Sequence, residues 1–147
     1  MTSAIVVAAA VVRNAHGEIL LVRKRDTARF MLPGGKIDAG ETAVGALERE
    51  LREELGCGFE RPDARFLGVF SAPAAHEPGQ TVTAHLYAVA LDGAASPTAE
   101  IEELAWIDAA APEGVPLAPL IQDVVLPLVR RGADRMSVAA RLIPPQA

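Results

Sequence analysis

The sequence predicts an α/β domain in which helices flank a mixed β-sheet. Two observations carry this prediction. Short runs of apolar and β-branched residues recur along the chain, and two other segments repeat their apolar residues at helical spacing. Strands and helices in this order build layered α/β domains. The 147 residues suffice for one domain to bury an extensive core, so we expect a single domain over residues 1–147.

The N-terminal part of the chain predicts two strands and a loop. The run SAIVVAAAVVR (3–13) is continuously apolar, as expected of a strand covered on both faces. Asn14 and Gly17 supply turn chemistry, and ILLVRK (19–24) is the returning strand. The following MLPGG (31–35) combines a proline with two glycines, which predicts a loop.

The best helix in the sequence runs from about Thr42 to Leu55. Its residues are mostly good helix formers, and Gly56 follows as a natural C-cap. One apolar stripe at 3.6-residue spacing is formed by Val44, Leu47, Leu51 and Leu55. We therefore expect this helix to pack by its leucines.

The second half of the chain predicts three strands and another helix. ARFLGVFS (64–71) and TVTAHLYAVAL (81–91) are strands joined by the loop APAAHEPGQ (72–80), and LAWI (104–107) is a short strand candidate. An amphipathic helix from Leu117 stops at Gly132, and Pro127 within it predicts a kink or an early end. The tail over 133–147 has no predicted structure.

Composition and charge narrow the class of protein. The net charge of −5 argues against a general binder of polymeric nucleic acid or anionic membranes. The N-terminal apolar run lacks a charged flank and is too short to span a bilayer. A single cysteine, Cys57, excludes an internal disulfide and favours a reducing compartment. We expect a cytoplasmic protein without a membrane anchor.

Three carboxylates gather on one sector of the predicted helix. Glu50, Glu53 and Glu54 stand at i, i+3 and i+4, so they repel one another unless they are protonated, paired or bridged by a cation. A hard divalent ion prefers such oxygen ligands. The ordinary alternative is a solvated acidic helix face.

The surroundings of this helix favour phosphate chemistry. Lys36 and the RKR run, with Arg23 and Arg25 at its ends, can offer cations to a substrate's phosphates. Acids that hold magnesium beside bases that hold phosphate are typical of phosphate-ester or anhydride chemistry. For the RKR run, an exposed strand end remains the alternative.

These residues fall into a known pattern. The chain resembles the Nudix box, in which Gly, five residues, Glu, seven residues and Arg-Glu-aliphatic-x-Glu-Glu-x-Gly-aliphatic occur in register. The box spans residues 35–57 here, and its specified positions are Gly35, Glu41, Arg49, Glu50, Leu51, Glu53, Glu54, Gly56 and Cys57. Only Cys57 departs, because the family usually has Ile, Leu or Val there. Buried cysteine behaves as a small hydrophobe, so the departure puts little in doubt.

The resemblance implies a Nudix hydrolase with an α/β/α sandwich fold. Such enzymes use a metal, Mg2+ with Mn2+ as a substitute, to cleave a nucleoside diphosphate linked to another group. By this resemblance Glu50, Glu53, Glu54 and the carbonyl of Gly34 are metal ligands. Arg49 orients the acids, Glu41 supports them, and Lys36 helps to hold the phosphate.

The general base has two candidate positions. One is within the box, at Glu53 or Glu54. The other precedes the last strand, as in MutT-like members, where Glu100 best fits by its distance before Trp106 and Glu103 comes second. Plain surface charge is the alternative for this acidic stretch. We expect Glu77, with His76 beside it in the proline-rich loop, to reach the opening of the site. An exposed loop position without a role in the site is the alternative.

The box gives the chemistry but not the substrate. The short chain is similar to MutT-like enzymes that remove oxidised or non-standard nucleoside triphosphates, which we rank first. Pro73 falls sixteen residues after the box, a spacing that resembles ADP-ribose hydrolases, so an ADP-ribose or nucleotide-sugar pyrophosphatase is the alternative. A non-catalytic nucleotide-binding module is expected to lose box acids, and all are present here. The apolar tail is compatible with a homodimer.

Overall fold

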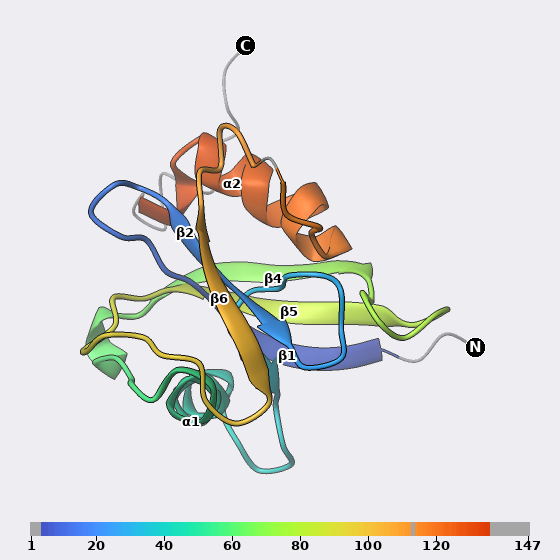
Figure 1. The fold of residues 1–147 in the computed structure, drawn as a ribbon. Coiled ribbons are helices and arrows are strands. Elements are labelled where there is room, and N and C mark those ends of the chain that lie inside the picture. Colours follow the sequence, from blue (N-terminus) through green and yellow to red (C-terminus); the bar gives the residue numbers. More distant parts are fainter. Residues whose placement is uncertain (1–3, 113, 136–147) are drawn as a thin grey trace.

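The computed structural model describes residues 4–112 and 114–135 (Figure 1). Its strands are β1 (Ala4–Val11), β2 (Ile19–Lys24), β3 (Gly34–Lys36), β4 (Arg65–Pro73), β5 (Thr81–Ala88) and β6 (Ile101–Ile107). Its helices are α1 (Ala43–Leu55) and α2 (Leu126–Arg130), with the π-helix η2 (Ile121–Val125) before α2 and the 3-10 turns η1 (Arg61–Asp63) and η3 (Ala133–Arg135).

The strands form a mixed four-stranded sheet and a separate pair. The larger sheet has the order β3-β1-β5-β4, in which β1 runs parallel to β5 while its other pairings are antiparallel. The second sheet pairs β2 with β6 in antiparallel fashion. Figure 1 shows α1 on one side of the larger sheet and α2 on the other. The predicted α/β class, with a mixed sheet and flanking helices, is confirmed.

The continuous apolar run at the N-terminus is explained by burial on both faces of β1. Ala9 and Val11 belong to the hydrophobic core that contains α2, whereas Ala8 and Ala10 belong to the core that contains α1. Side chains alternate between the two faces of a strand. A strand between two helical layers therefore needs an apolar residue at every position.

The predicted helix over 42–55 is confirmed as α1. The Thr42 hydroxyl caps its start by accepting a hydrogen bond from the Gly45 N–H at 3.1 Å. Gly56 ends it in the left-handed conformation, with φ of 74°. The buried face carries Leu47, Leu51 and Leu55, as the apolar stripe predicts, and also Glu54.

The prediction of a loop over 31–35 was wrong at its end, because β3 begins at Gly34. A Cβ on Gly34 would lie 2.2 Å from the Ala8 carbonyl oxygen, so only glycine allows β3 to approach β1 this closely. β6 is also longer than the predicted LAWI and begins at Ile101, while β5 ends at Ala88 rather than at 91.

The last helix is irregular, as Pro127 predicts. Residues Ile121–Val125 form a π-helix and Leu126–Arg130 continue as α2, so the helix does not end at the proline. Pro127 has no N–H to donate to the preceding turn, which favours a local change in the hydrogen-bond pattern. No helix among the described residues has the length and apolar character needed to cross a membrane.

A partly buried ion pair links the end of this helical segment to Arg13, two residues after β1. Arg13 donates from Nε to Oδ2 of Asp134 at 2.6 Å and from Nη2 to Oδ1 at 2.8 Å. The same Nη2 donates to the Val129 carbonyl at 3.0 Å. The hydrogen bonds to Asp134 and its charge raise the pKa of Arg13. The predicted tail over 133–147 begins here, and its residues from 136 lie outside the described part of the chain.

Candidate active site

The box acids Glu41, Glu50, Glu53 and Glu54 form an acidic patch, and Arg49 neutralises its Glu41 end. Arg49 donates from Nε and Nη2 to the two Glu41 carboxylate oxygens, both at 2.8 Å. The Asp38 N–H donates to the same carboxylate at 2.9 Å. The Arg49 bonds, with the Asp38 bond, lower the pKa of Glu41 from 4.5 to about 2. The carboxylates of Glu41 and Glu50 raise the pKa of Arg49. This end of the patch is a closed network.

Glu50 lies between Arg49 and the start of β3. Its Oε1 accepts a hydrogen bond from Arg49 Nη1 at 2.9 Å. A Cβ on Gly35 would lie 2.3 Å from the Glu50 carboxyl carbon and 2.6 Å from each of its oxygens. The missing side chain of Gly35 thus makes the space that the Glu50 carboxylate occupies against β3.

Glu54 is the buried member of the patch. It is 2% exposed, and its Oε1 accepts from the Gly34 N–H at 2.9 Å. Its Oε2 has no partner among the described residues. Burial raises the pKa of Glu54 to about 8, opposed by the Gly34 bond and the Lys24 charge and assisted by the charges of Glu50 and Glu100.

Glu53 differs from its two neighbours because its side chain faces solvent. The Glu53 side chain is 54% exposed, whereas that of Glu50 is 15% exposed. Its closest cation is Arg49 Nη1, at 3.6 Å from Oε1. Its backbone is fixed, since the Thr98 hydroxyl donates to the Glu53 carbonyl and the Thr98 N–H donates to the Glu54 carbonyl at 3.0 Å.

The donor set fits a divalent cation at the Glu54 end of the patch. As the side chains lie, no three histidine, cysteine, aspartate or glutamate side chains of residues 4–112 and 114–135 are grouped to hold a metal ion. Glu54 nevertheless presents a buried, unpartnered carboxylate oxygen, with Glu50 near enough to raise its pKa. A cation there would offset the cost of the buried charge.

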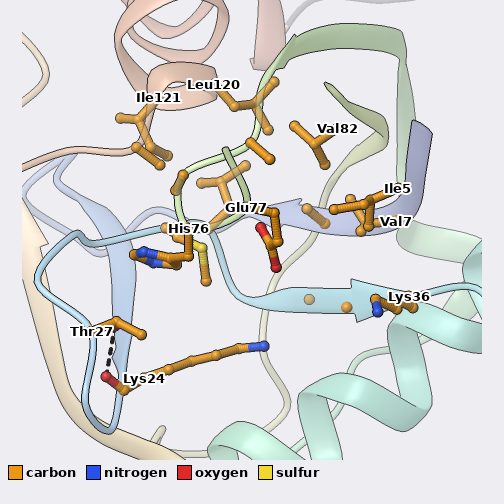
Figure 2. A pocket seen from close by; sticks show the side chains of 18 of the residues that line it. Ile5, Val7, Lys24, Thr27, Lys36, His76, Glu77, Val82, Leu120 and Ile121 are labelled. Atoms are coloured by element: carbon orange, nitrogen blue, oxygen red, sulfur yellow. Dashed lines mark hydrogen bonds between the residues drawn. The ribbon is translucent and has the colours of Figure 1, made fainter. Parts of the chain in front are cut away.

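A cavity of about 270 Å3 opens beside β3 (Figure 2). Its apolar lining comes from β1, β5 and the segment before α2, and includes Ile5, Val7, Val82, Leu120 and Ile121. Gly34 and Gly35 also line it, so the cavity adjoins the acidic patch. Its polar side chains are Lys24, Thr27, Lys36, His76 and Glu77.

The structure brings Lys24, rather than Arg23 or Arg25, into this cavity. Figure 2 shows the Lys24 side chain extending across the cavity. Arg23 instead donates to Glu103 and to the Thr27 carbonyl, both at 2.8 Å. Arg25 pairs with Glu102 at 3.5 Å. Successive side chains of a strand point to opposite faces, and this alternation is the sequence signal that places Lys24 and Arg23 on different sides of β2. Substrate binding by the two arginines stays a prediction.

Of the two candidate bases before Trp106, Glu100 lies beside the patch. Its Oε1 is 3.4 Å from Lys24 Nζ, and its charge contributes to the raised pKa of Glu54. Glu103 is held by Arg23 Nε at 2.8 Å. Lys36 and Glu77, also predicted for the substrate, both line the cavity.

The fold and the site together define a class of protein: a mixed-sheet α/β domain that places a carboxylate-bearing helix beside a lysine-lined cavity. The chain belongs to the NUDIX domain family, which it matches over residues 4–128. The family resemblance carried by the box is therefore confirmed.

Curated relatives of this chain are similar to it over part of their length. The 8-oxo-dGTP diphosphatase of Haemophilus influenzae is 48% identical over 54 residues, which are 34% of this chain and 40% of that protein. The 8-oxo-dGTP diphosphatase of Escherichia coli strain K12 is 41% identical over 54 residues, covering 34% of this chain and 42% of that protein. The chain thus matches about two fifths of the length of these relatives.

A solved structure extends the similarity to the whole fold. The MutT NUDIX hydrolase from Burkholderia pseudomallei superposes with a TM-score of 0.68 at 26% sequence identity. The superposition covers 88% of this chain and 97% of that protein. The order of elements seen here is therefore shared by a MutT-type protein.

Proposed function

We propose that the protein is a metal-dependent hydrolase of the pyrophosphate bond in a nucleoside diphosphate linked to another group. Its first-ranked substrates are nucleoside triphosphates, including oxidised ones, as for a MutT-like pyrophosphatase. The observation that carries the proposal is the buried Glu54 carboxylate with an unpartnered oxygen, beside a cavity that Lys24 and Lys36 line. Two relatives described above, both 8-oxo-dGTP diphosphatases, support it.

The proposed roles follow from position. Glu54, Glu50, Glu53 and the Gly34 carbonyl would hold Mg2+, or Mn2+ in its place. When bound, the ion neutralises the diphosphate and lowers the pKa of a water molecule that it binds. Arg49 holds Glu50 and Glu41 in place, as its hydrogen bonds indicate.

The phosphate and the attacking water need groups of their own. Lys24 and Lys36 face the cavity and are suited to the phosphate oxygens. Glu100, close to Lys24 and Glu54, is our first candidate to accept a proton from the attacking water, and Glu53 or Glu54 is the alternative. The ion pair with Lys24 would hold Glu100 near the cavity, which Lys24 lines.

A second substrate class has one observation in its favour. Pro73, whose spacing resembles that of ADP-ribose hydrolases, lines the cavity at the end of β4. We keep ADP-ribose or a nucleotide sugar as the alternative substrate. The remaining proposals concern the whole protein: one Nudix domain over 1–147, a cytoplasmic location, small nucleotides rather than polymeric nucleic acid as partners, and a homodimer.

A substrate panel tests the proposed function. The protein is incubated with Mg2+ and nucleoside triphosphates, 8-oxo-dGTP, ADP-ribose, nucleotide sugars or dinucleoside polyphosphates, and the released products are identified. We expect nucleoside monophosphate and pyrophosphate from the triphosphates, and loss of turnover with EDTA. Silence across the panel would defeat the enzymatic proposal. Calorimetric binding of a nucleotide without turnover would instead indicate a non-catalytic module.

A further inference from the structure

The tip of the β4–β5 hairpin has a defined geometry. The Gln80 N–H donates to the Glu77 carbonyl at 3.1 Å, and the Ala74 N–H donates to the Gln80 carbonyl at 2.9 Å. Between Glu77 and Gln80 stand Pro78 and Gly79, and Gly79 has φ of 79°. Proline followed by a residue with positive φ is the signature of a type II turn. The turn therefore fixes the backbone of Glu77 at its first position.

This turn brings the Glu77 carboxylate to the cavity. Figure 2 shows Glu77 among the lining residues. Its side chain points into the space between two groups of cavity residues, the apolar Val82, Leu120 and Ile121 and the basic Lys24 and Lys36. It is the one carboxylate among the described side chains that line the cavity. Within the described part of the chain no hydrogen bond or ion pair holds this side chain. A carboxylate is an acceptor on both oxygens, so it requires donors when a ligand covers it.

We propose that Glu77 selects a guanine-type base by accepting hydrogen bonds from its N1–H and its exocyclic N2 amine. This inference rests on the proposed nucleotide hydrolase function and names the base for that site. The apolar side chains of Ile5, Val7 and Val82 would contact the base. Lys24 and Lys36, elsewhere in the same cavity, would then face the phosphates.

The other bases do not match a carboxylate at their Watson–Crick edge. Guanine presents two adjacent donors, which pair with the two carboxylate oxygens. Adenine and cytosine each place a ring nitrogen acceptor beside their single amine, and thymine flanks its N3–H with two carbonyls. In each of these bases an acceptor would face a carboxylate oxygen and repel it. The 8-oxoguanine N7–H is also a donor, but the neighbouring C8 carbonyl would repel the second oxygen.

Equilibrium binding separates base recognition from catalysis. Calorimetry with Mg2+ compares dGMP, dIMP and dAMP on the wild-type protein, on Glu77→Ala and on Glu77→Gln. The base of dIMP differs from that of dGMP only by the missing N2 amine. We expect wild-type protein to prefer dGMP over dIMP by about tenfold, as for one hydrogen bond to a charged group. In Glu77→Ala this preference should disappear, so that dGMP and dIMP bind about equally. The affinity for dAMP should stay the same or improve.

A matched control uses another exposed glutamate outside the cavity. Glu60 stands before η1, and Glu60→Gln should leave all three affinities unchanged. Glu77→Gln retains one acceptor oxygen and gains a donor, so its preference for dGMP should lie between those of wild type and Glu77→Ala. Steady-state kcat/KM for dGTP, 8-oxo-dGTP and GTP completes the comparison.

Three results would overturn the proposal. One is an equal loss for all bases in Glu77→Ala, which would give Glu77 a general role. Another is a change confined to the 8-oxo-dGTP to dGTP ratio, which would indicate contact with N7–H. The third is a change in the GTP to dGTP ratio, which would place Glu77 at the ribose. If dGMP binds with the predicted selectivity but no triphosphate is cleaved, the proposed function fails and base recognition by Glu77 stands.

Discussion

The two ends of the acidic patch carry the same residue type in opposite electrostatic states. At one end, Glu41 is bound by Arg49 and the Asp38 N–H, and its pKa falls to about 2. At the other end, Glu54 is buried with one hydrogen bond from Gly34, and its pKa rises to about 8. Both ends lie within residues 41–54, which comprise the residues just before α1 and most of the helix itself.

This contrast indicates which part of the patch is scaffold and which part requires a cation. The Glu41 end has its counterion within the chain, so an added ion would gain little there. The Glu54 end has a buried carboxylate whose charged form is costly. A divalent ion is therefore expected to bind at the Glu54 end, with Arg49 holding Glu50 toward it. The predictions below test that division, beginning with the largest expected effect.

Removing the charge at the Glu54 end should have the largest effect. Glu54→Gln keeps the shape of the side chain but removes the anionic ligand, so we expect kcat to fall at least about 100-fold. The metal-free protein should not be destabilised at pH 8, because a buried charge has been removed. Steady-state kinetics and thermal unfolding in EDTA measure the two effects. Activity within about threefold of wild type would rule out Glu54 as an essential ligand.

Crowding the middle of the patch should have the next largest effect. In Gly35→Ala the added Cβ would lie 2.3 Å from the Glu50 carboxyl carbon, so this carboxylate must move. We expect kcat to fall about tenfold or more, because displaced catalytic groups lose positioning. Gly93→Ala is the matched control, since its Cβ meets only Cys57 at 3.6 Å. Equal activity in the two variants would show that the position of Glu50 is unimportant.

Removing the positive charge of Lys24, near Glu54, should have a smaller effect. Lys24→Met keeps the aliphatic stem and removes the ammonium that lines the cavity. We expect KM to rise about fivefold to tenfold through lost contact with phosphate. Arg25→Met is the control, because Arg25 pairs with Glu102 away from the cavity. A larger effect from Arg25→Met would restore the arginine assignment made from the sequence.

The smallest predicted effect is in the pH dependence of stability. Between pH 4.5 and about 8, folded Glu54 holds a proton that the unfolded chain has lost. Stability of the metal-free protein should therefore fall as pH rises through this window, by a few degrees in Tm. Glu54→Gln should flatten this slope. Glu41 acts oppositely, because its lowered pKa gives stability that is lost as pH falls from 4.5 toward 2.

Magnesium provides the control for this titration. At pH 7 Glu54 of the metal-free protein holds a proton, because its pKa is raised to about 8. Binding of Mg2+ to its carboxylate should release this proton, so the calorimetric enthalpy should depend on the buffer's ionisation enthalpy. The stabilisation by Mg2+ should also be larger at pH 8 than at pH 6. A wild-type unfolding curve without pH dependence between 5 and 8 would contradict the raised pKa.

Local signals in the sequence predicted local structure well. Thr42, the leucine stripe and Gly56 define α1 because caps and periodicity act within a few residues. The strand at Gly34 was missed because its pairing with β1 is long-range, and glycine next to proline ordinarily indicates a loop. Tertiary contact overrode the local preference there.

The candidate site shows the same limit. The spacing of Glu50, Glu53 and Glu54 places them in one helical sector, but the docking of α1 decides which of them is buried. Sequence alone therefore could not separate buried Glu54 from exposed Glu53. Alternation along β2 could have selected Lys24. The entry of Glu77 into the cavity instead depends on the β4–β5 hairpin lying beside cavity residues of β1 and β2, which are distant in the sequence.

The Arg13–Asp134 pair has a consequence for synthesis of the protein on the ribosome. Its partners are separated by 121 residues, and β1 must also wait for β5, which begins at Thr81. At about 5–20 residues per second, Asp134 is made roughly 6–24 s after Arg13. The apolar N-terminal strand is thus without its parallel neighbour until residues 81–88 have been made. Nascent chains of this protein should be good clients for chaperones that cover exposed hydrophobic segments.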